Sequence, residues 1–120
     1  MKRFILIFSI LSVLSFPVLA QDSKENADFK LAVNLYNDKL YDLALEQFRA
    51  FINLYPNTAQ GVEAHFYLGL TQSKLGKHDE ARFTFQNFAL AYSDNSKAPE
   101  AWMNAAERSE EHTSELQSHY

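Results

Sequence analysis

The sequence predicts an all-α protein in which antiparallel helix pairs stack as repeats. Four apolar side chains follow the spacing i, i+4, i+7 and i+11 of a single helix face: Ala44, Phe48, Phe51 and Tyr55. The same four residue types return 37 positions later: Ala81, Phe85, Phe88 and Tyr92. A period between roughly 20 and 50 residues is typical of a stacked array, in which each unit buries its apolar face against its neighbours. We therefore expect an α-solenoid of two units and the start of a third.

The first unit is expected to contain two helices joined by a short turn. Its first helix spans residues 28–37, the turn covers 38–40, and the second helix runs from about Asp42 to Tyr55. Pro56 stops that second helix, because proline lacks a backbone donor and crowds the preceding turn. The segment 21–26, which precedes the unit, is a short polar leader.

The second unit repeats this plan with clearer start and stop signals. Asn57 or Thr58 caps a helix that runs to Leu75, and Gly76 ends it. The next helix runs from about 79 to 92, and its first turn carries Asp79 and Glu80, which interact favourably with the helix dipole.

A fifth helix opens the third unit at about 96–100. Pro99 lies in its first turn, where the missing donor costs nothing. With the 37-residue offset, Trp102 corresponds to His65 and Ala106 to Gly69. Because no second helix follows to complete the unit, we expect Trp102 and Met103 to be exposed.

Small residues mark the contact within each helix pair. Ala32 and Gly69 precede Ala44 and Ala81 by twelve positions, which lets two antiparallel helices approach closely. This pattern, read in the second unit through Leu68, Gly69, Gly76, Ala81 and Phe85, resembles the tetratricopeptide repeat from about residue 27 to residue 107. The period exceeds the common length of about 34 residues. A phenylalanine also replaces the usual small residue late in each second helix. This longer variety resembles the repeats of BamD-like outer-membrane assembly lipoproteins and of YbgF-like proteins of the Tol-Pal system.

The resemblance implies a binding groove, because the first helix of each unit lines a concave face in tetratricopeptide arrays. The implied groove residues are Phe29, Val33, Tyr36, Asn37, Phe66, Leu70, Ser73 and Lys74. An apolar groove with Asn37 and Lys74 at its side suits an extended peptide or a partner helix. The alternative is that further repeats or a neighbouring domain cover this face.

The first twenty residues have the pattern of a secretory signal peptide. Lys2 and Arg3 precede an apolar run, and small residues end it at Ala20. We therefore expect secretion across the inner membrane to the periplasm, with a mature chain that begins at Gln21. The sequence contains no cysteine, so the lipid anchor of the BamD-like proteins is not expected.

The repeat pattern stops at Arg108. Residues 108–118 match the translation of a common short-read sequencing adapter, so we interpret residues 108–120 as a non-native tail. The repeat domain is accordingly expected to span residues 27–107.

Composition and motifs favour a protein without chemistry of its own. The net charge is −4 and no basic stripe is present, which argues against nucleic acid as a partner. His65 and His78 lack the spacing of metal ligands, and both are expected to pack between helices. The sequence therefore predicts a non-catalytic scaffold of the cell envelope, without cofactor, that binds protein partners such as outer-membrane assembly proteins. The alternative is the N-terminal repeat region of a longer envelope enzyme whose catalytic domain is missing.

Overall fold

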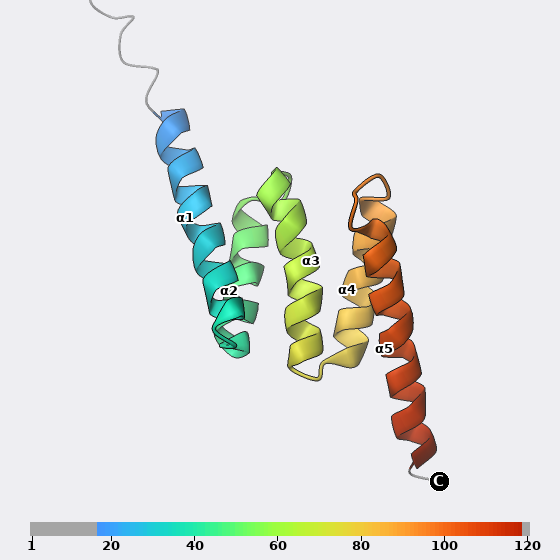
Figure 1. The fold of residues 1–120 in the computed structure, drawn as a ribbon. Helices are drawn as coiled ribbons and strands as arrows, with labels where there is room; N and C mark the ends of the chain where they lie inside the picture. The colour runs from blue at the N-terminus through green and yellow to red at the C-terminus, as the bar shows by residue number, and fades with distance from the viewer. Residues whose placement is uncertain (1–16, 119–120) are drawn as a thin grey trace, which may run out of the picture.

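Residues 17–118 are described in the computed structural model, and they form five α-helices (Figure 1). The helices are α1 (Pro17–Asn37), α2 (Tyr41–Leu54), α3 (Ala59–Lys74), α4 (His78–Ala91) and α5 (Ala98–Ser118). Each helix packs against the next along the chain, and α1 also contacts α3. The pairs α1–α2 and α3–α4 form two units, and α5 begins a third. The predicted all-helical stack of helix pairs is confirmed over these residues.

The outer two helices are longer than predicted. α1 begins at Pro17 rather than at Asp28, and it includes the segment predicted to be a polar leader, residues 21–26. Lys24 and Asp28, one turn apart, form an ion pair of 2.8 Å there. α5 continues past Glu107 to Ser118, through the adapter-like segment. The repeat pattern used for prediction is missing in both extensions, so it could not predict them. Residues 1–16 of the predicted signal peptide and residues 119–120 of the tail lie outside the described residues.

The two helix-pair turns have the same geometry, although their sequences differ. Gly76 ends the first helix of unit two with φ of 73°, and Lys39, 37 positions earlier, has φ of 62°. The backbone N–H groups of Leu40 and Lys77 each donate to a carbonyl five residues back, at 2.9 Å. Glycine adopts this left-handed conformation without steric cost, whereas lysine does not. The predicted cap of α3 is confirmed at Thr58, whose hydroxyl accepts from the Gly61 N–H at 3.0 Å.

The core consists of two clusters, one for each unit, and the repeated aromatic residues form both. Phe48 and Phe51 are buried in the first cluster, and Phe85 and Phe88 in the second, each with at most 2% of its surface exposed. A Cβ atom at Gly69 would lie 2.7 Å from the Phe85 ring, so glycine is required for this close approach. The predicted core positions are therefore confirmed.

The last helix leaves apolar side chains uncovered, as predicted. Trp102 is 46% exposed and Met103 is 73% exposed. No helix within residues 17–118 has the length and apolar character needed to cross a membrane.

Candidate functional site

A hollow of about 400 Å³ lies where the first helices of the three units converge. Its lining comes from one residue of α1, three of α3 and two of α5: Tyr36, Leu70, Ser73, Lys74, Asn104 and Arg108. Since α1, α3 and α5 hold the same place in successive units, the hollow runs across the face on which the sequence predicted a groove. Four of the eight predicted groove residues, Tyr36, Leu70, Ser73 and Lys74, meet in it.

The aromatic side of the hollow is held in place by two other tyrosines. The Tyr36 ring stands edge-on to Tyr41 and Tyr67, with ring centroids 5.5 Å apart in each pair. Burial, and then the charges that Tyr41 and Tyr67 could carry, raise the pKa of the Tyr36 hydroxyl above 10.0. Tyr36 is therefore uncharged at neutral pH and presents a half-buried, amphipathic ring to the hollow.

The opposite side of the hollow is rich in hydrogen-bond donors. Lys74 is exposed at the end of α3. The Asn104 side-chain Nδ2 is buried and has no hydrogen-bond partner within the part of the chain that the structure describes. Arg108 pairs with Glu107 at 3.5 Å. A cation and an unpaired amide donor beside apolar side chains suit a ligand that offers carbonyl or carboxylate oxygens.

A family-wide sequence profile, described as tetratricopeptide repeat, matches residues 26–58 and 63–95. The two matches cover more than half of the chain. The chain belongs to the tetratricopeptide repeat family. The matches start 37 residues apart, which is the period found in the sequence. No curated protein matches the chain in a full-sequence comparison. Tetratricopeptide repeats generally mediate binding between proteins, and the fold is typically a non-catalytic scaffold.

Three of the other predicted groove residues, Phe29, Val33 and Asn37, do not line the hollow. Phe29 and Val33 are half-buried and pack against the core cluster of unit one. The Phe29 ring lies 5.4 Å from Phe51. Asn37 is exposed as the last residue of α1 and does not line the hollow.

The prediction for Phe66 is wrong. Its side chain is only 3% exposed, and its ring lies edge-on to Phe85 and Phe88 of α4, with centroids 5.6 and 5.4 Å away. The Lys97 Nζ also sits 5.2 Å from the ring centroid. Because α3 and α4 are antiparallel, the C-terminal half of α4 closes over the N-terminal half of α3, and Phe66 belongs to the core of the repeat.

Sequence reasoning missed two residues at one equivalent position of the repeats. Asn104 corresponds to Tyr67 through the 37-residue offset, and neither was identified. Tyr67 stacks on Phe48 at 5.3 Å and joins the two units. Neither the recurrence of residue types nor the resemblance, which supplied the groove positions, assigns a role to this position.

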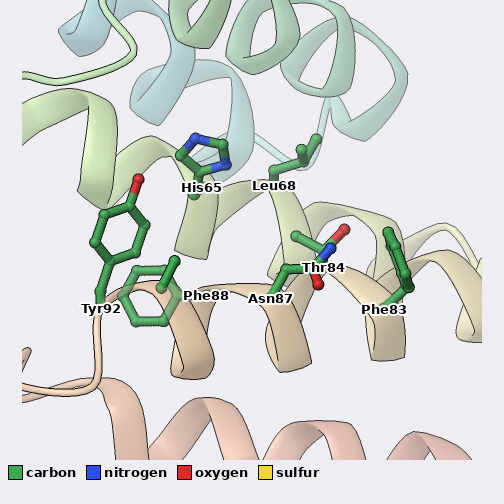
Figure 2. Close-up of a pocket in the computed structure, with 8 residues that line it drawn as sticks. His65, Leu68, Phe83, Thr84, Asn87, Phe88 and Tyr92 are labelled. Carbon is green, nitrogen blue, oxygen red and sulfur yellow. The ribbon is translucent and has the colours of Figure 1, made fainter.

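A second, smaller hollow of about 220 Å³ lies between α3 and α4. Figure 2 shows His65 and Leu68 from α3 facing Phe83, Thr84 and Asn87 from α4, and Tyr92, which follows α4. The His65 and Tyr92 rings are 6.1 Å apart, and burial lowers the pKa of His65 below 6.5. A neutral, packed imidazole agrees with the structural role expected for His65. Among the described residues, no group of three or more His, Cys, Asp or Glu side chains could hold a metal ion.

Proposed function

We propose that the protein is a non-catalytic scaffold of the cell envelope that binds a peptide segment of a partner protein between α1, α3 and α5. The observation that carries the proposal is the hollow itself, because it gathers side chains from the first helix of all three units. In a stacked array this face is shared by successive units, so an extended ligand can contact several repeats at once.

The lining defines the chemistry of the partner segment. Tyr36 and Leu70 offer apolar contact area, while Lys74 and Asn104 offer donors. The best ligand therefore carries an apolar or aromatic side chain next to a carboxylate, from Asp, Glu or a C-terminus. Arg108 would add to the positive side, but the proposal rests on Lys74 and Asn104, which precede the adapter-like segment.

The envelope location rests on sequence features alone. Residues 1–20 have the order of a signal peptide, and the long period with its late phenylalanine resembles the BamD-like and YbgF-like envelope proteins. We accordingly place the protein in the periplasm without a lipid anchor, with envelope or outer-membrane assembly proteins as partners. Mass spectrometry of periplasmic material should find Gln21 as the first residue. Retention of Met1 would refute the secretion signal.

The binding proposal is tested with a peptide selected from a display library on the purified chain. Lys74→Glu and Tyr36→Ala should each weaken the affinity for that peptide by ~10-fold or more, the scale of an interface hot spot. Lys74 is exposed, so its variant keeps the fold even where loss of the Tyr36 ring disturbs packing against Tyr41.

Matched controls on α4 separate groove binding from general effects. Phe83→Ala removes a ring that is 66% exposed, and Arg82→Glu reverses a charge that pairs with Asp79 at 3.6 Å on the same helix. Both controls should bind within about twofold of the unchanged chain, because exposed pairs contribute only ~0–1 kcal/mol. Circular dichroism confirms that helicity is retained. The groove is not the binding site if Lys74→Glu binds the peptide with unchanged affinity, or if the two control variants lose as much affinity as the groove variants do.

A further inference from the structure

Lys97 holds the start of α5 against α3. It directly precedes α5, and its backbone carbonyl accepts a helical hydrogen bond from the Ala101 N–H at 2.9 Å. The Lys97 Nζ lies 3.2 Å from the Glu63 Oε1. It also stands over the rings of Phe66 and Tyr67, 5.2 and 5.7 Å from their centroids. These three partners are spaced i, i+3 and i+4, so they lie on one face of α3, and that face receives the lysine.

The junction between α1 and α3 has a link at the equivalent positions. The Gln60 side-chain amide donates to the Asn26 Oδ1 at 2.6 Å. Adding the repeat period of 37 to these two numbers gives Lys97 and Glu63. We call each of the two pairs a strut. A polar contact between successive first helices thus recurs at one place in the array, although the residue types do not: the first strut is neutral and the second is ionic.

The second strut and the groove lie toward opposite ends of α3. Glu63 is in the second turn of that helix, whereas Leu70 and Lys74, which line the hollow, are in its last turns. At 1.5 Å per residue, Glu63 and Lys74 are roughly 16 Å apart along the helix. The helices α1, α3 and α5 run in the same direction (Figure 1). A link near their starts therefore affects how far apart they stand at the groove.

The position of α5 depends on its strut more than the position of α1 does. α1 packs directly on α3, and Tyr36 of α1 meets Tyr67 of α3 edge-on, with ring centroids 5.5 Å apart. Among the described helices, α5 packs on α4 and has no comparable packing on α3. Lys97 therefore gives α5 a direct link to α3, and through the Tyr67 ring this link reaches Tyr36 in the hollow.

We propose that Lys97 is a positioning residue of the groove, which sets the spacing between α3 and α5 at which Lys74 and Asn104 contact one ligand. The inference rests on the proposed function, because it concerns the same groove. Lys97 does not line the hollow, so it acts through the position of α5. Loss of the strut lowers the fraction of molecules with the competent spacing, and the apparent affinity falls by that fraction. The strut precedes the adapter-like segment and does not involve it.

The exposure of the strut sets the size of the expected effect. The Lys97 and Glu63 side chains are 37% and 42% exposed, so water screens the ion pair and its contribution is modest. The contact of the ammonium with the two rings adds a contribution of similar size. We therefore expect affinity changes of about 3- to 10-fold rather than complete loss of binding.

The experiment begins with the affinity for the library-selected peptide. Lys97→Glu places a second carboxylate beside Glu63 and should weaken that affinity by ~10-fold. Lys97→Glu combined with Glu63→Lys restores an ion pair of reversed polarity, and it should bind within about threefold of the unchanged chain. Lys77→Glu is the matched control, because Lys77 is 40% exposed and pairs at 3.8 Å with Glu80 rather than with a neighbouring first helix. It should bind within about twofold.

The spacing of the helices is measured on the same variants without peptide. The sequence contains no cysteine, so Asn34→Cys on α1 and Ala106→Cys on α5, both at exposed positions, accept nitroxide labels at these two sites alone. Pulsed electron paramagnetic resonance should give longer or broader distances in Lys97→Glu and the original distances in the variant with the reversed pair. Circular dichroism checks that every variant keeps its helicity.

The two measurements separate failure of this inference from failure of the proposed function. Unchanged distances in Lys97→Glu overturn the inference, whatever the affinity. It is also overturned if Lys74→Glu weakens binding but Lys97→Glu does not, or if the reversed pair fails to restore affinity. If the distances change while Lys97→Glu and Lys74→Glu both bind the peptide normally, Lys97 does set the spacing, and the proposed function is refuted instead.

Discussion

The two junctions between successive units are built from opposite kinds of side chain. Between α2 and α3, Phe48 stacks on Tyr67 with centroids 5.3 Å apart and an interplanar angle of 12°. Between α4 and α5, the equivalent of Tyr67 is Asn104, and Ala101 and Ala105 of α5 are buried in one cluster with Phe85, Phe88 and Ala89 of α4. At the first junction α3 offers the ring of Tyr67 to the core phenylalanine Phe48, whereas at the second junction α5 offers alanines, which we call the alanine seam.

This difference shows how a change of residue type at one equivalent position can form a site in a repeat protein. At the first junction the Tyr67 ring occupies the space between the units and contacts Tyr36 on the groove side. At the second junction Asn104 replaces the ring and lines the hollow, and its amide nitrogen is buried without a partner among the described residues. The donor-rich side of the groove therefore arises where the aromatic residue is lost.

The largest expected effect is loss of a core ring in either unit. Phe48→Ala and Phe85→Ala should each lower the free energy of unfolding by ~3–5 kcal/mol, because truncation of a buried ring leaves a cavity. A short array has little stability to lose, so either variant can fail to fold. Thermal melts followed by circular dichroism measure the effect. A shift of only a degree or two would mean that these rings are not core.

An intermediate effect is expected from overfilling the alanine seam. Ala101 is fully buried, so Ala101→Leu should lower the free energy of unfolding by ~1–3 kcal/mol through steric strain between α4 and α5. Ala106→Leu on the exposed side of α5 is the matched control and should stay within ~0.5 kcal/mol. Urea denaturation of the three proteins gives the comparison. Equal stability of both variants would show that the seam is not tightly packed.

The smallest effect is the coupling between the stacked rings. A double-mutant cycle of Phe48→Leu and Tyr67→Leu should give an interaction of ~0.5–1.5 kcal/mol, as expected for aromatic pairs beyond their buried area. The equivalent cycle of Phe85→Leu and Asn104→Leu should give less than ~0.5 kcal/mol, because no ring pair exists there. Similar coupling in both cycles would erase the distinction between the junctions.

The sequence predicted those parts of the fold whose residue types recur in both units. The predictions that were wrong concern segments without a counterpart in the other unit. Phe48 and Phe85 were identified as core because the same ring returns at the same spacing. The early start of α1 at Pro17 had no counterpart in the second unit, so the recurrence on which the prediction relied gave no signal for it.

The candidate site was predicted in part for the same reason. The resemblance assigned Tyr36 and Lys74 to one groove because the first helix of each unit lines it, and both residues line one hollow in the structure. Phe66 shares the helix face of Leu70, but the antiparallel course of α4 brings Phe88 over its end of α3. Asn104 was missed because its significance comes from what it replaces, which requires the packing of Tyr67 to be seen.

The central claim is that the partner segment lies across α1, α3 and α5. Amide chemical-shift mapping by NMR, with the library-selected peptide added to labelled protein, tests it most directly. We expect the largest shifts at Tyr36, at residues 70–74 and at the Asn104 side-chain amide. Shifts confined to the exposed side of α4 around Phe83, with none at Tyr36 or Asn104, would contradict the assignment of the groove.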